Sequence, residues 1–359
     1  MKINIIGSVG VPANYGGFES LIENLLDHNN HNFKYQVFCS KRHYSKQLKQ
    51  YKNANLIYLN LRANGISSVF YDGLSLFYCI KNKSRIILLL GVSGAIFLPF
   101  LKPWLKSKII CNIDGLEWKR SKWNYVTKVF LRYSELIAIK YSDEIISDNK
   151  GIADYVLSVY NKESTTIAYG ANFNLKTNKA PTEAYGLNKK EYFFKVCRIE
   201  PENNIALILD SFSEIKNERI VIVGNWNNSS FGKKIRNKYS RFSNIFLLDP
   251  IYNLHDLNEL RTNCKAYIHG HSAGGTNPSL VEAMGLRLPI IAYDVNFNRY
   301  TLDNNGTYFS NKNDLIREIK RFDSRDVEMD VEKIHETFLN RYTAEKIAEE
   351  YAKLFLKSS

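Results

Sequence analysis

The sequence predicts an α/β protein made of two doubly wound domains, each with a parallel sheet. Three observations support this fold class. The chain has 359 residues, which is long enough for two ordinary domains with separate cores. Short apolar runs alternate with segments of helical character, a pattern typical of parallel sheets with crossover helices. The pattern lapses between Tyr169 and Lys190 and then restarts, which indicates a linker between the domains.

These features give the expected domain boundaries. Residues 1–170 should form the N-terminal domain, 171–190 the linker, 191–340 the C-terminal domain and 341–359 a terminal helix. Doubly wound domains bind ligands at the carboxyl ends of their strands. Two such domains that face each other across a cleft would therefore both contribute to one site.

The expected strands are short runs rich in branched apolar residues. In the first domain they span Ile3–Ile6, Tyr35–Cys39, Asn55–Leu59, Ile86–Leu90, Lys108–Ile113, Glu144–Ser147 and Thr165–Ala168. In the second domain they span Tyr192–Val196, Ile220–Val223, Ile245–Leu248, Ala266–Ile268 and Pro289–Tyr293.

Apolar residues at helical spacing mark the expected helices. A helix should begin at Phe18, with Leu21, Ile22, Leu25 and Leu26 on its buried face. The same pattern places Glu19 and Glu23 on the outer side of this helix. Further helices are expected over Asn204–Glu214, Leu254–Asn263 and Thr343–Leu356.

Composition limits the class of protein. The chain is 45% hydrophobic and 13% aromatic, as in globular proteins. Its five cysteines are scattered, which fits reduced thiols and gives no metal cluster. No signal peptide is apparent, and the longest apolar run, Ile86–Leu101, is short for a membrane span. We therefore expect a soluble or peripheral protein.

Positive charge is concentrated in the first half of the chain. The net charge is +13, and residues 1–170 hold 22 Lys and Arg against 12 Asp and Glu. A basic domain suits an anionic lipid, a polyanionic substrate or nucleic acid, or it serves solubility alone. We expect no nucleic-acid partner, because the chain carries no recognised nucleic-acid-binding motif.

The segment Tyr267–Asp294 is the centre of the predicted function. It reads as strand, glycine-containing loop, helix and strand, with Asn277 as the helix cap and Pro278 in the first turn. Free amides and the positive end of a helix dipole attract phosphate at such a site. Glu282 near this helix start either accepts hydrogen bonds from sugar hydroxyls or satisfies the helix dipole at the surface.

Within this segment, HGHSAGGTNPSLVEAMG resembles the nucleotide-sugar site of the retaining GT-B enzymes of glycosyltransferase family 4. It is most similar to the bacterial rhamnosyltransferase-like branch of surface polysaccharide assembly. The resemblance implies a GT-B fold of two Rossmann-like domains, with the donor in the C-terminal one and the acceptor in the N-terminal one. Glu282 matches the second Glu of the family's Glu-x7-Glu motif, which binds the nucleotide ribose. The first Glu falls on Gly274, so the chain departs from the motif there.

The loop Gly7–Gly17 after the first strand is a second candidate site. It is not the dinucleotide fingerprint, although a glycine loop before a helix binds anions, or it is simply a turn that needs glycine. Its part PANYGGFE resembles the opening motif of the same branch. This resemblance implies that Gly16 and Gly17 lie at the donor phosphates or the reacting carbon.

Asp114 follows a strand in the stretch IDGLEWKR, which also resembles the branch. An Asp at this position either orients an acceptor hydroxyl and takes its proton, or forms a turn or cap. Family-4 enzymes often have His near this position. We expect Glu117, Lys119 and Arg120 to contact the acceptor.

Arg198 ends a strand in CRIEPENN and suits a diphosphate, because a guanidinium donates two parallel hydrogen bonds. The alternative is a surface ion pair with Glu200 or Glu202. The resemblance implies the diphosphate, although the Lys that family-4 proteins add a few residues later is missing here. Gly224-Asn225-Trp226 follows another strand and would form a wall beside the base.

The expected catalytic residues are Asp114, Arg198 and Gly17. The expected donor-binding residues are Gly16, Gly17, Arg198, Asn225, His271, Gly274, Gly275, Thr276, Asn277, Pro278, Ser279 and Glu282. His269 and His271 have no third ligand at metal-binding spacing, and no Asp-x-Asp stands near a strand end. We therefore expect no cofactor and no essential metal.

Phe97–Lys108 combines aromatic residues with lysines. This composition suits a segment that lies in a lipid headgroup layer, and it equally suits a core segment with a solvent-exposed edge. Together with the excess positive charge of residues 1–170, it supports an acceptor domain that works on anionic membrane lipid, and we expect a peripheral protein on the cytoplasmic face of the membrane. The resemblance also implies the activity, which is sugar transfer from dTDP-rhamnose to an undecaprenyl diphosphate-linked saccharide in O-antigen or capsule synthesis. A nucleotide-sugar epimerase and a non-catalytic donor-binding subunit are the alternatives.

Overall fold

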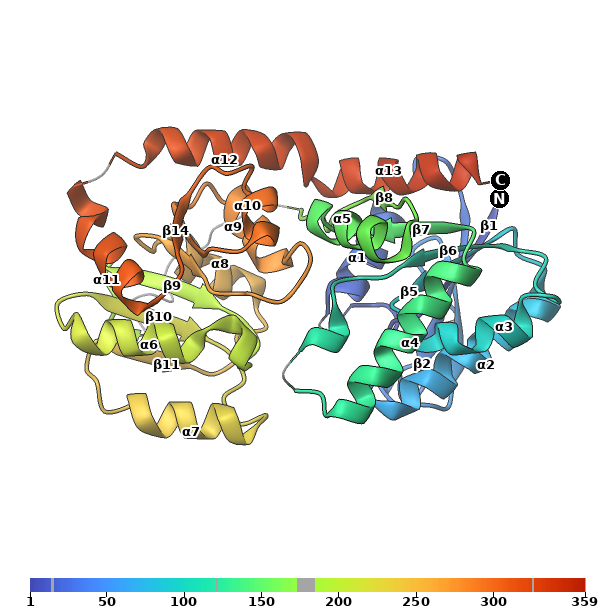
Figure 1. Ribbon diagram of the computed structural model, residues 1–359, viewed down its shortest axis with the longest axis horizontal. Coiled ribbons are helices and arrows are strands. Elements are labelled where there is room, and N and C mark those ends of the chain that lie inside the picture. The colour runs from blue at the N-terminus through green and yellow to red at the C-terminus, as the bar shows by residue number, and fades with distance from the viewer. Residues whose placement is uncertain (14–15, 121, 173–184, 325, 359) are drawn as a thin grey trace. The chain divides into compact units, whose positions relative to one another are not determined.

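The computed structural model describes residues 1–13, 16–120, 122–172, 185–324 and 326–358, and the chain divides into two compact units (Figure 1). Unit 1 comprises Met1–Asn172 and Arg341–Ser359, and unit 2 comprises Phe173–Asn340. The C-terminal helix thus belongs to unit 1, although it follows unit 2 in the chain. Of the expected linker, residues 173–184 lie outside the described residues.

Unit 1 is built on an eight-stranded sheet in the order β3-β4-β2-β1-β5-β6-β7-β8. All its neighbouring strands are parallel except β3, which pairs with β4 in the antiparallel direction. The strand order reverses between β1 and β5, where doubly wound folds place their ligands. The strands are β1 (Lys2–Ile6), β2 (Lys34–Ser40), β3 (Gln50–Tyr51), β4 (Ala54–Leu59), β5 (Ile86–Leu90), β6 (Lys108–Asn112), β7 (Glu144–Ser147) and β8 (Thr165–Thr166).

The helices of unit 1 connect these strands, and the last one closes the core. They are α1 (Gly17–Asp27), α2 (Ile66–Asn82), α3 (Leu98–Leu101), α4 (Tyr125–Tyr141), α5 (Lys150–Tyr160) and α13 (Ala344–Lys357), with the short 3-10 helices η1 (Ser93–Phe97) and η2 (Glu117–Lys119). Helix α13 packs against α1 and buries Tyr351 and Phe355 in the same apolar cluster as Ile22 and Leu25. This burial explains why the C-terminal helix is part of unit 1.

Unit 2 is built on a six-stranded sheet in the order β11-β10-β9-β12-β13-β14, with all pairs parallel. Its order reverses between β9 and β12. The strands are β9 (Tyr192–Val196), β10 (Arg219–Val223), β11 (Ile245–Leu248), β12 (Tyr267–His269), β13 (Ile290–Tyr293) and β14 (Thr307–Phe309). The helices are α6 (Ile205–Glu214), α7 (Ser230–Tyr239), α8 (Leu254–Thr262), α9 (Pro278–Gly285), α10 (Asn296–Thr301), α11 (Lys312–Arg321) and α12 (Glu328–Arg341), with η4 (Pro201–Asn203) and η5 (Phe322–Ser324).

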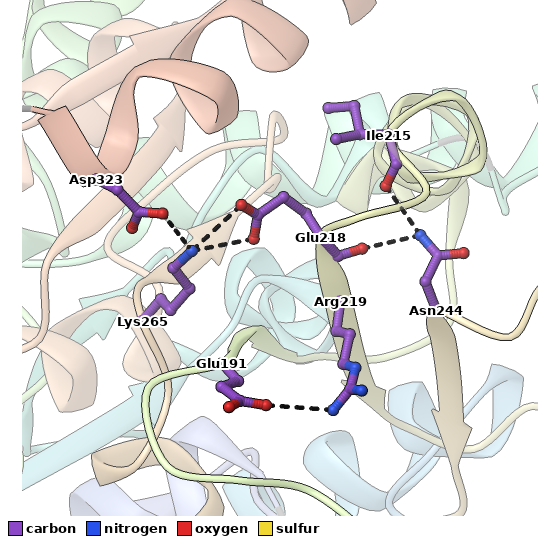
Figure 2. A network of polar contacts seen from close by, with 7 residues as sticks. All are labelled: Glu191, Ile215, Glu218, Arg219, Asn244, Lys265 and Asp323. Atoms are coloured by element: carbon purple, nitrogen blue, oxygen red, sulfur yellow. Dashed lines mark hydrogen bonds and ion pairs between the residues drawn. The ribbon is translucent and has the colours of Figure 1, made fainter.

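Polar contacts fix the amino ends of the strands in unit 2 (Figure 2). Lys265, just before β12, binds Glu218 at 3.1 Å and Asp323 at 2.9 Å. Asn244, just before β11, donates to the carbonyls of Glu218 and Ile215 at 2.8 and 3.1 Å. Because all strands are parallel, this network occupies one edge of the sheet and leaves the carboxyl ends at the other edge.

The predicted strands are largely confirmed. Those at Ile86–Leu90, Glu144–Ser147, Tyr192–Val196 and Ile245–Leu248 have the predicted bounds. The pattern missed β3 and β14, which have two and three residues and are too short to show a period. Among the described residues, every helix is too short or too polar to cross a bilayer.

Candidate functional site

The carboxyl edge of the sheet in unit 2 brings together two segments that are far apart in the sequence. Strands β9 and β12 are neighbours at the point where the strand order reverses. Arg198 follows β9, and the loop that begins at Gly270 follows β12. Two groups of predicted donor residues thus follow the ends of neighbouring strands: Arg198 after β9, and the segment from His271 to Ser279 after β12.

Two asparagines tie these segments together. Asn203 donates to the Arg198 carbonyl at 2.8 Å and lies 3.0 Å from His271 Nδ1 through its Oδ1. Asn204 donates to the Gly270 carbonyl at 2.9 Å. These contacts hold the segment after β9 against the loop after β12, so the position of Arg198 depends on the loop that contains His271.

Gly270 is required at this junction because the two backbones touch. A Cβ atom at Gly270 would lie 2.3 Å from the Asn203 carbonyl oxygen. The Ser272 amide and hydroxyl both donate to the Glu202 carbonyl, at 2.9 and 3.0 Å. The loop after β12 therefore rests directly on the turn around Asn203.

Helix α9 begins as the sequence predicts. Asn277 is its N-cap and accepts from the Ser279 amide at 3.1 Å and from the Ser279 hydroxyl at 2.8 Å. Pro278 is in the first turn, and the Tyr267 hydroxyl donates to Ser279 Oγ at 2.9 Å. The Ser279 amide and hydroxyl are thus engaged in the cap. The preceding loop holds the other predicted donor contacts, of which Gly275 and Thr276 are buried and Gly274 is partly exposed.

Glu282 forms an ion pair with Arg261 of α8. The Arg261 side chain is 6% exposed, whereas that of Glu282 is 33% exposed. Arg261 also donates to Asn258 at 3.0 Å. The carboxylate is therefore neither a fully solvated surface group nor a buried one. It is held in place from the protein side while part of it remains open to solvent.

Among the residues that the structure describes, Arg198 has a single, loose ion-pair partner. Its Nε lies 3.8 Å from Glu200 Oε2, and 43% of its side chain is exposed. The surface ion pair considered as an alternative is present, but it is too long for a hydrogen bond. The guanidinium is thus able to bind an anion at the carboxyl edge of the sheet.

The predicted wall beside the base is only partly correct. Asn225 is exposed at the end of β10, whereas Trp226 is fully buried and donates through Nε1 to the Leu248 carbonyl at 2.8 Å. The indole is a core side chain, because its ring fills the apolar cluster between the sheet and its helices. Trp226 therefore does not line a ligand site.

The two histidines of the loop are both buried. The rings of His269 and His271 are 6.3 Å apart. Burial lowers the pKa of His269 well below its usual range, so this ring is neutral. Across the described residues, no three His, Cys, Asp or Glu side chains gather in a way that could hold a metal ion.

In unit 1, the glycine loop after β1 is fastened to α1 by carboxylates. Glu19 is 7% exposed, and its Oε1 accepts from the Val9 amide at 2.7 Å. Glu23 accepts from the Ala13 amide at 2.9 Å. The prediction that both residues line the outer side of α1 is therefore wrong for Glu19, because the loop folds back over the start of the helix and buries it.

Gly16 and Gly17 lie where this loop meets α1. Gly17 is the first residue of the helix, and Gly16 precedes it with φ of 141°. A Cβ at Gly16 would lie 1.9 Å from Glu19 Oε2. The backbone conformation thus requires glycine here, and a Cβ would also displace the Glu19 carboxylate. Asn14 and Tyr15 of the PANYGGFE motif lie outside the described residues.

Asp114 occupies a left-handed turn after β6, with φ of 59°. Its amide donates to Asn112 Oδ1 at 2.9 Å, so the turn is capped by Asn112 rather than by Asp114. The Tyr169 hydroxyl donates to Asp114 Oδ1 at 2.9 Å. Burial, and secondarily Asp114, raise the pKa of Tyr169 well above its usual range, so the phenol stays protonated and orients the carboxylate.

The predicted acceptor contacts near Asp114 form their own network. Glu117 pairs with Arg120 at 2.8 Å and with Lys122 at 3.0 Å, and accepts from Trp123 Nε1 at 3.0 Å. Lys119 is exposed and lies over the Trp118 ring, 5.4 Å from its centre. Lys119 is therefore the most accessible of the three predicted residues.

Sequence reasoning missed Asn203, Asn204 and Glu19 as residues that shape the two loops. Asn204 has φ of 50°, a conformation that Asn tolerates better than most residues. The pair of asparagines after a strand was thus a signal for a structured turn. The role of Glu19 had no such signal, because its partner amide at Val9 lies ten residues away along an irregular loop.

Comparison with known families separates the chain into the same two parts. Residues 180–337 match the model of the glycosyl transferases group 1 family. Residues 1–172 match the model of a domain of unknown function, DUF1972. The C-terminal part, which holds Arg198 and Glu282, is thus the part of the chain that is similar to the glycosyl transferases group 1 family.

Solved glycosyltransferase structures share the fold of the whole chain. Sucrose-phosphate synthase from Thermosynechococcus elongatus has a TM-score of 0.84 at 15% identity, with 99% of this chain and 98% of that chain covered. Anabaena HepE, in complex with UDP and glucose, has a TM-score of 0.77 at 12% identity, covering 99% and 100%. Trehalose-6-phosphate synthase, from a study of glycosyltransfer with retention, has a TM-score of 0.76 at 9% identity, covering 99% of both chains. The predicted GT-B fold is confirmed.

Proposed function

We propose, from the glycosyltransferase group 1 domain at residues 180–337, that this chain transfers L-rhamnose from dTDP-rhamnose to a lipid-linked saccharide. The acceptor would be carried on undecaprenyl diphosphate at the cytoplasmic face of the membrane, and the product would enter O-antigen or capsule synthesis. The observation that carries the proposal is the junction of Arg198, the loop after β12 and α9 at the carboxyl edge of the unit 2 sheet.

This junction suits a nucleotide diphosphate. The exposed guanidinium of Arg198 offers paired donors to phosphate oxygens, and the start of α9 adds the positive end of a helix dipole. Glu282 lies one helical turn further along α9, and its carboxylate would accept hydrogen bonds from ribose hydroxyls, whereas it would repel a phosphate. Positive charge from Arg198 and from the α9 dipole would stabilise the diphosphate as it leaves. We propose that this occurs without an essential metal.

The acceptor side of the proposal rests on unit 1. Asp114 is oriented by Tyr169 at a strand end of that unit and would position the acceptor hydroxyl or take its proton. The basic character of residues 1–170 suits an acceptor that carries a diphosphate. Transfer with retention is supported by the family-4 resemblance and by the fold shared with trehalose-6-phosphate synthase.

A two-step experiment tests the proposal. The protein is first screened for thermal stabilisation by dTDP-rhamnose, UDP-glucose, GDP-mannose and the free nucleotides, without added metal and with EDTA. The best donor is then incubated with and without undecaprenyl diphosphate-linked saccharides, and the anomeric configuration of the product is read by NMR.

We expect stabilisation by dTDP-rhamnose in EDTA and a product with the same anomeric configuration as the donor, which is retention; a product of the opposite configuration would mean inversion. Conversion of the donor without acceptor would identify an epimerase instead. Donor binding without turnover on any acceptor would favour a non-catalytic subunit. Preference for another sugar nucleotide would reject rhamnose while keeping the glycosyltransferase.

A further inference from the structure

Helix α2 in unit 1 exposes an apolar stripe. Ile66, Phe70, Leu74, Phe77 and Tyr78 are 84%, 61%, 44%, 52% and 40% exposed. Their spacing of three to four residues places them along one side of the helix. The opposite side of α2 buries Tyr71, Leu76 and Cys79. The helix is thus apolar on its outer as well as its inner face.

Helix α4 repeats this arrangement. Tyr125, Val126, Val129, Tyr133 and Leu136 are 80%, 75%, 51%, 56% and 42% exposed, again at helical spacing. Between the two helices in the sequence, Phe100 of α3 and the nearby Trp104 are 69% and 63% exposed. Large apolar side chains exposed this close together indicate an interaction surface, whereas single exposed apolar residues are common on any protein surface.

These stripes belong to neighbouring elements. The 3-10 helix η1 packs against both α2 and α4, and α3 packs against η1 and α4. Figure 1 shows α2, α3 and α4 grouped on the same part of unit 1. We call the outward residues of these three helices, together with Trp104, the α2–α4 face.

Positive charges predominate in the part of the chain that carries the α2–α4 face. Residues 66–140 contain twelve Lys and Arg and four Asp and Glu. Two of the four acids, Asp72 and Glu135, are buried at 2% exposure, so they contribute little to the surface. Lys81, Lys106, Arg132 and Lys140 are exposed on or beside these helices.

Lysines and aromatic rings lie together on this surface. The Lys81 ammonium is 6.0 Å from the centre of the Phe77 ring, and that of Lys140 is 5.7 Å from the Tyr141 ring. A bilayer surface suits this combination, because aromatic rings enter the headgroup layer while long basic side chains reach lipid phosphates.

We propose that the α2–α4 face rests on the surface of an anionic phospholipid bilayer. The charge distribution selects this occupant. A second copy of the chain would bring one basic face against another, and like charges would oppose the contact. An anionic bilayer instead satisfies the apolar stripes and the basic residues at once.

This inference rests on the proposed function and adds to it, because a lipid-linked acceptor is presented at a membrane. It names the contact surface within unit 1 and assigns it to α2, α3 and α4. The sequence had suggested only Phe97–Lys108, which supplies Phe100, Trp104 and Lys106 to this surface.

The test is flotation of the full chain with vesicles of phosphatidylcholine alone or with phosphatidylglycerol added. Three double variants are compared with the unaltered chain. Phe70→Ser/Tyr133→Ser removes one aromatic side chain from each stripe. Lys81→Glu/Lys140→Glu reverses two charges beside them. Tyr252→Ser/Leu254→Ser is the matched control, since these unit 2 residues are 72% and 66% exposed but lie outside the face.

We expect binding to vesicles that contain phosphatidylglycerol and at least tenfold weaker partitioning for each of the two face variants. The charge reversal should have this effect because each basic residue near an anionic surface contributes roughly fivefold. The control variant should bind like the unaltered chain. Thermal unfolding and size-exclusion profiles should be unchanged in all three, because the substituted side chains are exposed.

Three results would overturn the proposal: no vesicle binding by the unaltered chain, equal binding with and without phosphatidylglycerol, or full binding by the face variants. A dimer that the face variants dissociate would assign the face to self-association instead. Donor stabilisation, measured in the same preparations without vesicles, reports on the unit 2 site separately. Failure of membrane binding is therefore distinguishable from failure of the proposed activity.

Discussion

Replacement of Glu282 by Ala should have two separable effects, one on stability and one on donor affinity. The stability effect follows from Arg261, whose side chain is 6% exposed and which loses its carboxylate partner. Removing one partner of a buried ion pair costs roughly 3–5 kcal/mol. Glu282 is one-third exposed and Arg261 keeps Asn258 as a partner, so we reduce this to about 1–3 kcal/mol. The unfolding midpoint of unit 2 should fall by about 5 °C.

The affinity effect tests the proposed role directly. If the carboxylate accepts hydrogen bonds from the ribose hydroxyls, its removal costs roughly 1.5–3 kcal/mol for each bond. The dissociation constant for dTDP should therefore rise at least tenfold. The assay is calorimetric titration of dTDP at a temperature well below the unfolding midpoint of the variant, so that the stability effect does not enter the measured affinity.

Arg261→Ala is the matched control, because it breaks the same ion pair and leaves the carboxylate in place. It should destabilise the unit while the affinity for dTDP stays within about threefold of the original. Unchanged affinity in Glu282→Ala would refute the assignment of Glu282 to the donor. Equal losses of affinity in both variants would mean that the pair acts only by holding α8 and α9 together.

The remaining predictions concern other parts of both units. Arg198→Ala should lower kcat by at least roughly a hundredfold with little loss of stability, since the side chain is 43% exposed; near-normal turnover in a steady-state assay would remove Arg198 from the site. Gly16→Ala should abolish transfer while dTDP still binds unit 2, because a side chain is strained at φ of 141° and its Cβ would displace the Glu19 carboxylate that holds the Val9 amide; transfer at the original rate would contradict a role of this loop in the reaction. Burial raises the pKa of Asp72 to about 7 from its ordinary value of 3.8, so the folded chain holds a proton that the unfolded chain releases in this range. The free energy of unfolding should therefore fall as pH rises from 4 to 7, by up to about 4 kcal/mol, and Asp72→Asn should remove this slope in urea titrations at pH 5 and pH 8. An identical slope in the variant would show that Asp72 does not titrate there.

Much of the fold could be predicted because buried strands have a simple signature. Strands such as Ile86–Leu90 are apolar at every position, since helices cover both faces of a parallel sheet. Helices α2 and α4 had no comparable signature. Their outer stripes are as apolar as their inner ones, so the alternation that reveals an amphipathic helix is blurred.

The local structure of the candidate site was predictable where one short segment forms it. The cap at Asn277, the proline in the first turn and the position of Glu282 are local properties of a single strand–loop–helix unit. The partner of Glu282 was not predictable, because Arg261 lies 21 residues away on another helix. The burial of Trp226 was not predictable either, because it depends on elements from several parts of the chain that pack around the indole.

The sequence by itself determined the succession of strands and helices and the residue types at the end of each strand, because hydrophobic periodicity and capping act over a few neighbouring residues. Only the tertiary structure decided which strand ends are neighbours, which carboxylates face the protein and which helix faces stay uncovered. Those outcomes depend on contacts between distant segments. Asn203 against His271, Glu282 against Arg261 and α13 on unit 1 are such contacts, and no local pattern encodes them.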